Sequence, residues 1–477
     1  MTNNKTKGLV KNTMIVSIGK VCTQLLSFLL LPLYTTYLST TEYGIVDLVS
    51  TISTLIVPFI TLQLDQGIFR FLIDVRQNDE KKRIVISTTF LFLVFQVFIY
   101  TIIFFILSFF INNRYKYFLL GYLIANSFTN LLLQIARGLG CNDKYTIGSF
   151  LYAAIGVILN VIFIAGLKLN ANGMLLATII GYIVCCLYLF FANNLKKYIK
   201  LENFNKSVLK ELIKYSAPLI SNAISWWVVN ASDRIIVSTF LGVAINGVYS
   251  VANKFSSIIT TVFGIFNITW TEAAAIYYEE KDRDEFFNKV YDATIRLYGA
   301  LCIGIIVCMP IIFPIFIDSK YEEAYNQIPI LIIATFFNVL VSFLGSIYVA
   351  KKKSKEIAKT SIFAAIINII AHLILIRYIK LYAASISTLL AWFSMYLYRY
   401  VDSKKYVKLH NNKIIFSLLL ILLLDTISYY INNINISILM LIITVTYSIL
   451  INMRNIKLLI ELMKNKCKNI IKKKEKN

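Results

Sequence analysis

The sequence is poor in the residues from which most catalytic and metal centres are built. Charged residues make up only 15% of its 477 positions, and histidine occurs twice. No cysteines and histidines stand at metal-ligand spacing, and no nucleophile motif or glycine-rich phosphate loop occurs. We therefore expect no metal site and no cofactor, and we do not expect an enzyme.

Long apolar segments fill almost the whole chain instead. Hydrophobic residues make up 58% of the sequence, and its mean hydropathy is +0.70. A membrane-spanning helix needs roughly 20 mostly apolar residues, because it must cross about 30 Å of hydrocarbon with its backbone polar groups paired internally. The sequence therefore predicts an all-α integral membrane protein with about 14 transmembrane helices. They lie near residues 14–38, 43–66, 84–111, 117–136, 145–167, 172–192, 215–241, 247–270, 293–317, 327–350, 357–376, 382–399, 414–431 and 436–452.

Basic residues are distributed very unevenly between the two predicted sides of the membrane. Of the 48 Lys and Arg residues, 39 lie on one predicted side of the membrane, in its loops, in both tails and in the adjoining span ends. Only six lie in the loops on the other predicted side. The positive-inside rule then places both termini in the cytoplasm. The net charge of +23 is thus explained by topology and by contact with anionic lipids, and no nucleic-acid partner is expected.

The predicted outer loops are short and contain no cysteine, so neither a disulfide framework nor an extracellular catalytic domain is expected. A membrane enzyme of cell-envelope assembly would need a sizeable outer loop with carboxylates. The sequence therefore disfavours such an enzyme.

The sequence contains an internal repeat. Residues 8–49 align without a gap to residues 211–252, so that Leu38 falls on Leu241 and Gly44 falls on Gly247. Both halves begin on the cytoplasmic side, which predicts two parallel six-helix repeats, followed by two unpaired helices. The expected parts are an N-terminal lobe over 1–193, an amphipathic cytoplasmic linker helix over 194–214, a second lobe over 215–400, helices 13 and 14 over 401–453 and a basic cytoplasmic tail over 454–477.

Three cations interrupt the predicted spans, where a charge costs roughly 2.5–3.5 kcal/mol on insertion scales. They are Lys20, Arg234 and Lys254. Arg234 and Lys254 lie seven residues from the outer ends of two successive spans, so both should lie at the same depth. Arg234 borders a polar helical face with Asn222, Trp226, Asn230 and Asp233. We expect this set to line a water-filled cavity that binds an anion, although Asp233 could instead neutralise a neighbouring cation.

Carboxylates within the spans are candidates for coupling to an ion, or they are structural. Asp47 and Asp65 share a polar stripe in the second predicted span. His372 is interpreted as a buried polar contact rather than a proton relay. Asp425 is an isolated group that either pairs within the bundle or indicates a tilted or poorly placed span.

Four stretches of the chain resemble the polysaccharide flippases (the O-antigen and capsule exporters of Wzx type) in the multidrug/oligosaccharidyl-lipid/polysaccharide (MOP) exporter superfamily. They are Leu38–Gly44, Leu64–Phe71, Tyr215–Ile220 and the region from Asn230 to Ala252, and with the span layout they cover essentially the full chain.

The resemblance implies two lobes around a central cavity and alternating access in the bacterial cytoplasmic membrane. The cargo would be an undecaprenyl-diphosphate-linked oligosaccharide carried from the inner to the outer leaflet. The implied partners are membrane lipids, an ion such as H⁺ or Na⁺, and polysaccharide polymerase machinery. A multidrug or small-metabolite antiporter of the same fold and a lipid II-type flippase stay open as alternatives, although a cavity with cations favours an anionic cargo.

Overall fold

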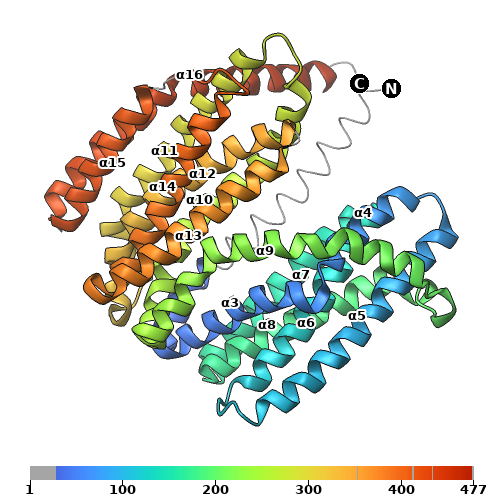
Figure 1. The fold of residues 1–477 in the computed structure, drawn as a ribbon. Helices are drawn as coiled ribbons and strands as arrows, with labels where there is room; N and C mark the ends of the chain where they lie inside the picture. The colour runs from blue at the N-terminus through green and yellow to red at the C-terminus, as the bar shows by residue number, and fades with distance from the viewer. Residues whose placement is uncertain (1–27, 352, 411–412, 432, 475–477) are drawn as a thin grey trace. The chain divides into compact units, whose positions relative to one another are not determined.

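The computed structural model describes residues 28–474 except 352, 411–412 and 432, and this part of the chain contains helices and no strands (Figure 1). The prediction of an all-α protein is confirmed. The helices in the first predicted repeat are α2 (Leu31–Tyr37), α3 (Thr40–Thr61), α4 (Leu64–Val75), α5 (Asp79–Ser108), α6 (Lys116–Leu139), α7 (Asn142–Asn160), the π-helix η1 (Val161–Gly166) and α8 (Asn170–Ala192).

Two short 3₁₀ helices, η2 (Leu195–Lys197) and η3 (Leu201–Asn203), follow. The remaining elements are α9 (Lys206–Phe240), α10 (Val243–Tyr277), α11 (Arg283–Phe316), η4 (Ser319–Gln327), α12 (Ile328–Ala350), α13 (Ser354–Ile379), α14 (Tyr382–Ser403), α15 (Lys413–Ile431) and α16 (Ile434–Lys474).

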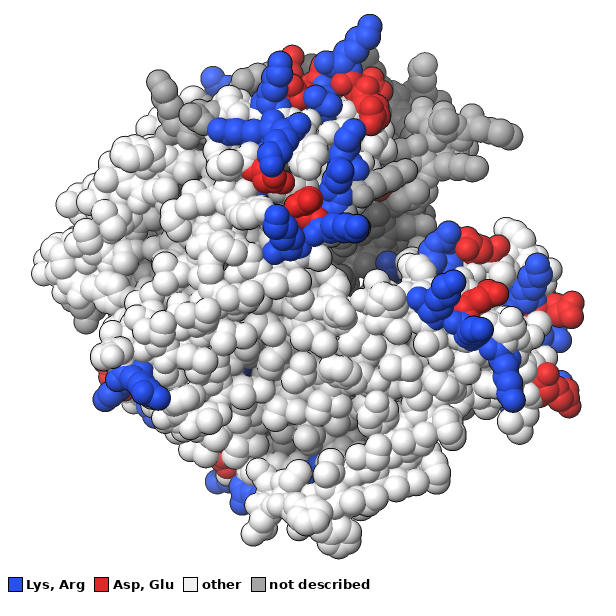
Figure 2. All heavy atoms as spheres, in the orientation of Figure 1, with Lys and Arg blue, Asp and Glu red and all other residues white. Residues whose placement is uncertain are grey.

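Eleven helices in the described part are long and apolar enough to cross a membrane. Helices α9 and α14 are not among them, and both carry polar residues along their length. Most of the first predicted span, including Lys20, lies outside the described residues. On the face seen in Figure 2, charged side chains gather at helix ends and leave the flanks between them almost free of charge. This is the distribution expected of a multi-pass membrane protein.

The second predicted span, 43–66, is not one continuous helix. Helix α3 begins with a capping box, in which Ser39 Oγ accepts from the Glu42 amide and the Glu42 carboxylate accepts from the Ser39 amide. It ends at Leu62, which is left-handed at φ 48°, as is Gln63 at φ 56°. The chain therefore restarts as α4, and Asp65 lies in the first turn of that helix rather than on α3 with Asp47.

The prediction of one amphipathic helix over 194–214 is wrong. The segment forms η2 and η3, and α9 begins at Lys206 and runs on into the next predicted span. Backbone amides of this segment donate to side chains of α5 instead of to helical carbonyls. Ser87 Oγ accepts from the Lys200 amide at 3.1 Å, and Thr88 Oγ1 accepts from the Asn205 amide at 3.0 Å.

The chain forms two compact units, whose boundary crosses α10 after Lys254. One unit comprises residues 1–254, 317–324 and 361–391, and the other comprises 255–316, 325–360 and 392–477. In the first unit, Ile68, Ile135 and Leu189 belong to a core in which α4, α5, α6 and α8 meet. In the second unit, α11 packs on α15 and α16, and Trp270 stacks on Phe343 at 4.4 Å between ring centroids. The division into two six-helix lobes stays a prediction from the sequence.

Candidate functional site

An ion pair joins the two predicted repeats within the first unit. Arg234 Nε on α9 lies 3.1 Å from Asp47 Oδ2 on α3, and both side chains are about one fifth exposed. Asn246 of α10 donates from Nδ2 to the same carboxylate oxygen at 3.2 Å. Arg234, in the seventh predicted span, is thus paired with Asp47, which lies nearly 190 positions earlier in the sequence.

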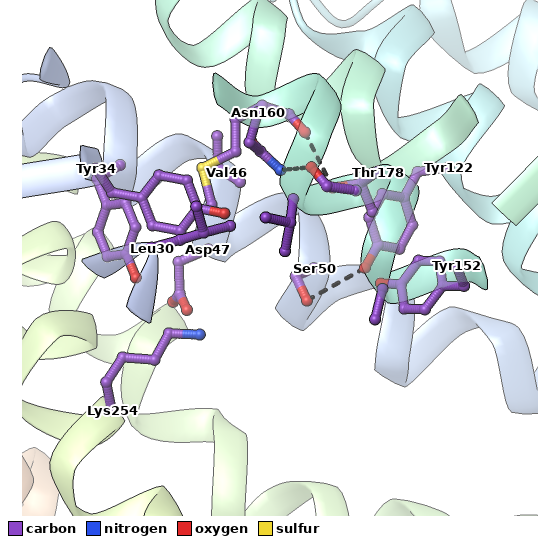
Figure 3. A pocket seen from close by; sticks show the side chains of 15 residues that line it. Leu30, Tyr34, Val46, Asp47, Ser50, Tyr122, Tyr152, Asn160, Thr178 and Lys254 are labelled. Atoms are coloured by element: carbon purple, nitrogen blue, oxygen red, sulfur yellow. Dashed lines mark hydrogen bonds between the residues drawn. The ribbon is translucent and has the colours of Figure 1, made fainter. Parts of the chain in front are cut away.

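Lys254 of α10 and Asp47 line one cavity of about 200 Å³ in this unit. Figure 3 shows these two side chains at one end of the cavity and Tyr122 and Tyr152 at the other. Its lining comes from the start of the described chain and from α2, α3, α6, α7, α8 and α10. Asp47 thus connects the two cations, because it pairs with Arg234, which is not among the lining residues, and lines the cavity together with Lys254. The matched depth of Arg234 and Lys254 stays a prediction.

Three members of the predicted polar face of α9 are exposed. They are Asn222, Trp226 and Asn230, and Trp226 is 38% exposed. Asn230 Nδ2 donates back to the Trp226 carbonyl at 2.8 Å, which leaves its amide oxygen available. An exposed polar stripe on a membrane helix favours contact with water or a polar ligand over contact with lipid.

Asp233, by contrast, is buried and has partners other than Arg234. Its Oδ1 lies 3.0 Å from His372 Nδ1 on α13, and its Oδ2 accepts hydrogen bonds from Tyr249 at 3.3 Å and from Thr388. Asp233 is 4% exposed and His372 is fully buried. The expectation that His372 makes a buried polar contact is confirmed. The ion pair of Arg234 is formed with Asp47, and neutralisation of a neighbouring cation by Asp233 stays an open alternative.

Asp65 does not join this group. Its carboxylate is buried in the first turn of α4 and accepts from Gln66 Nε2 at 2.8 Å. Asp425 does pair within the bundle, as one reading of the sequence had it, because Thr444 of α16 donates to its Oδ1 at 2.8 Å.

Sequence reasoning missed two groups of residues. Arg399 was counted with an inner loop, yet it is 2% exposed within α14, where Nε donates to Thr360 Oγ1 at 3.0 Å and Nη1 to the Val341 carbonyl at 2.9 Å. Its position near a span end gave no sign of burial. The second group is the tyrosine-rich wall of the cavity, whose members come from four separate helices and share no local pattern.

The family model of the polysaccharide biosynthesis proteins matches residues 9–271, which is more than half of the chain. The chain belongs to this family. The resemblance identified from the four sequence stretches is thereby confirmed. No curated protein matches the sequence.

Solved structures similar to this polysaccharide biosynthesis protein are transporters. An inward-facing multidrug resistance MATE family transporter of the MOP superfamily has a TM-score of 0.66 at 14% identity, over 82% of this chain and 98% of that chain. An outward-facing conformation of such a transporter has a TM-score of 0.57 at 14% identity, over 83% and 96%. A MATE crystal structure in complex with MaD3S has a TM-score of 0.58 at 15% identity, over 84% and 96%. These likenesses establish the MATE-like transporter fold.

Proposed function

We propose that this protein carries a lipid-linked oligosaccharide from the inner to the outer leaflet of the bacterial cytoplasmic membrane by alternating access. The observation that carries this proposal is the meeting of Arg234, Asp47 and Lys254 in the first unit. Arg234 and Lys254 place two cations beside Asp47 among membrane helices. Paired cations at depth suit an anionic cargo, and the diphosphate of a polyprenyl-linked sugar is such an anion.

A transporter is needed for this cargo because its polar headgroup pays heavily to leave water for hydrocarbon. A polar cavity that opens in turn to each side removes this barrier while the lipid tail stays in the bilayer. Arg234 would bind the diphosphate through its planar guanidinium, and Lys254 would add a compact second charge. Lys20 and the exposed stripe of Asn222, Trp226 and Asn230 are proposed to contact the remainder of the headgroup.

The cargo and Asp47 would compete for Arg234. Neutralisation of Asp47 by H⁺, or its screening by Na⁺, would release the guanidinium for the diphosphate, which links ion binding to cargo binding at one place. Asp65 stays a second coupling candidate. Asp233 is buried against His372, which suits a coupling or positioning role better than direct contact with the cargo.

Reconstitution in liposomes tests the proposal. Liposomes that contain a lipid-linked oligosaccharide should show faster appearance of the sugar on the opposite leaflet with the protein than without it. Equal rates would overturn the proposal. The same liposomes distinguish the alternatives, since transport of a cationic drug would favour a multidrug antiporter and transport of lipid II alone would favour a lipid II-type flippase.

A further inference from the structure

The end of the cavity away from its charged residues has the chemistry of a sugar-binding site. The tyrosines Tyr34, Tyr43, Tyr122 and Tyr152 line the cavity, with the hydroxyls of Ser50 and Thr178 and the amide of Asn160. Apolar side chains such as Val46, Val157 and Met174 fill the rest of the wall. This mixture suits a ring that has apolar C–H faces and polar hydroxyl edges.

Asn160 provides an acceptor that lacks a protein donor. It is 5% exposed, and its Nδ2 donates to the Gly156 carbonyl at 2.6 Å. No residue in the described part of the chain donates to its Oδ1, which is itself buried. A buried amide oxygen without a donor costs about 1–3 kcal/mol, so a group that supplies a hydroxyl hydrogen there gains affinity.

The backbone around Asn160 is also unusual. Asn160 ends α7, and the chain continues directly into the π-helix η1 (Val161–Gly166). Such π-helical segments are rare and occur frequently at functional sites. One turn before Asn160, a Cβ added at Gly156 would meet no atom within 4 Å. The space next to α7 is therefore open at that point.

Tyr182 of α8 holds the aromatic wall in place. Its ring stacks on Tyr152 with centroids 4.5 Å apart and meets Tyr122 edge-on at 5.4 Å. The Tyr122 and Tyr182 hydroxyl oxygens lie 3.4 Å apart, and Tyr122 also donates to Ser50 Oγ at 3.5 Å. The rings are therefore oriented before a ligand arrives, which lowers the entropic cost of binding.

We infer that this tyrosine-lined end, which we define as Tyr122, Tyr152 and Asn160, binds the first sugar of the cargo, next to the diphosphate. The inference rests on the proposed function, because Lys254 and Asp47 lie at the other end of the same cavity (Figure 3). Among the described residues, Asp47 and Lys254 are the charged members of the lining, and both lie away from Tyr122 and Tyr152. We therefore assign a neutral sugar to the tyrosine-lined end, a hexose or an N-acetylhexosamine rather than a uronic acid.

Binding to the full-length protein in detergent tests this assignment. The probes are farnesyl diphosphate and farnesyl-diphospho-linked glucose, galactose, N-acetylglucosamine and N-acetylgalactosamine. We expect at least one sugar-bearing probe to bind about tenfold more tightly than farnesyl diphosphate, as one or two good hydrogen bonds would provide. If none of the four binds more tightly, the sugar site is overturned. If farnesyl diphosphate and all four probes fail to bind, the proposed function fails with it.

The variant Asn160→Leu should abolish the preference for the sugar and leave the affinity for farnesyl diphosphate unchanged. Asn193→Leu is the matched control. Asn193 is 6% exposed, its Nδ2 donates to the carbonyl four residues earlier at 2.9 Å, and its Oδ1 also lacks a donor among the described residues, but it does not line the cavity. Equal effects of the two variants would show that Asn160 is only structural.

A second variant tests the same site by adding bulk. Gly156→Leu should weaken binding of the sugar-bearing probe several-fold, because its side chain can enter the open space beside Asn160. Gly304→Leu in α11 is its control, since a Cβ there also meets nothing within 4 Å. Retained preference in Gly156→Leu, together with retained preference in Asn160→Leu, would overturn the assignment.

Discussion

Gly44 and Gly247, which the internal repeat aligns with each other, touch each other in the structure. A Cβ added at Gly44 of α3 would lie 2.1 Å from the Val243 carbonyl oxygen, and one added at Gly247 of α10 would lie 2.0 Å from the Thr40 carbonyl oxygen. Thr40 and Val243 are themselves related by the repeat offset of 203. The contact is therefore reciprocal, as at a two-fold axis, and it supports duplication of an ancestral unit.

This crossing makes a first prediction. Gly44→Ala or Gly247→Ala should destabilise the packed state by about 1–3 kcal/mol, because a backbone carbonyl cannot move aside as a side chain can. We expect a lower thermal unfolding temperature in detergent and less surface polysaccharide in cells. Gly264→Ala is the control, since its added Cβ meets nothing within 4 Å. If all three variants unfold at the same temperature, the close crossing is not required.

The second prediction concerns competition for Arg234. Asp47→Asn removes the carboxylate that lies 3.1 Å from the Arg234 Nε, so the Arg234 guanidinium becomes available to an anion. Affinity for farnesyl diphosphate should rise about three- to tenfold, as expected for loss of a partly exposed competing charge. Asp74→Asn removes the carboxylate of an exposed ion pair with Arg70 and should leave the affinity unchanged. Weaker binding by Asp47→Asn would contradict the competition.

The third prediction concerns the cations themselves. Arg234→Ala and Lys254→Ala should each reduce surface polysaccharide while the protein stays in the membrane, and farnesyl diphosphate should bind at least about tenfold less tightly. Arg234→Lys should restore part of the binding, because the charge remains and the planar guanidinium does not. Arg296→Ala serves as a control, since Arg296 donates to the Ile451 carbonyl in the other unit. Normal export by the Arg234→Ala/Lys254→Ala double variant would refute the anion site.

The sequence predicted the helices well because each depends on a local run of apolar residues. It also predicts one depth for Arg234 and Lys254, because the rise of a helix converts residue number into distance, and this stays a prediction. It could not identify Asp47 as the partner of Arg234, since that pairing depends on how α3 packs on α9. The break between α3 and α4 could not be predicted, because the left-handed residues Leu62 and Gln63 are not glycines and no local sequence signal marks them.

Asp233 and His372 support a fourth prediction. His372→Leu should destabilise the protein by about 3 kcal/mol, because it leaves a buried carboxylate without one of its partners. Asp233→Asn should reverse much of that loss in the double variant, since a neutral amide is less costly to bury. Thermal unfolding of the two single variants and the double variant measures their coupling. Strictly additive effects would show that the 3.0 Å contact contributes no interaction energy.

The last prediction concerns the sides of the membrane. The excess of Lys and Arg predicts that the 194–214 segment and both termini lie in the cytoplasm. Single cysteines at Asn205 and Glu202, both exposed in the structure, should be protected from a membrane-impermeant maleimide in intact cells and labelled after the cells are opened. Glu202 is included because Asn205 caps α9 through its side chain, which accepts from the Ser207 and Val208 amides.

A cysteine at Tyr378 provides the opposite control. Tyr378 is 80% exposed in the last turn of α13, at the end that is predicted to face outside. Its cysteine should therefore be labelled in intact cells. Labelling of Asn205 and Glu202 cysteines in intact cells, with Tyr378 protected, would invert the topology. Arg234 and Lys254 would then lie nearer the cytoplasmic surface, and the charge bias of the loops would need a cause other than the positive-inside rule.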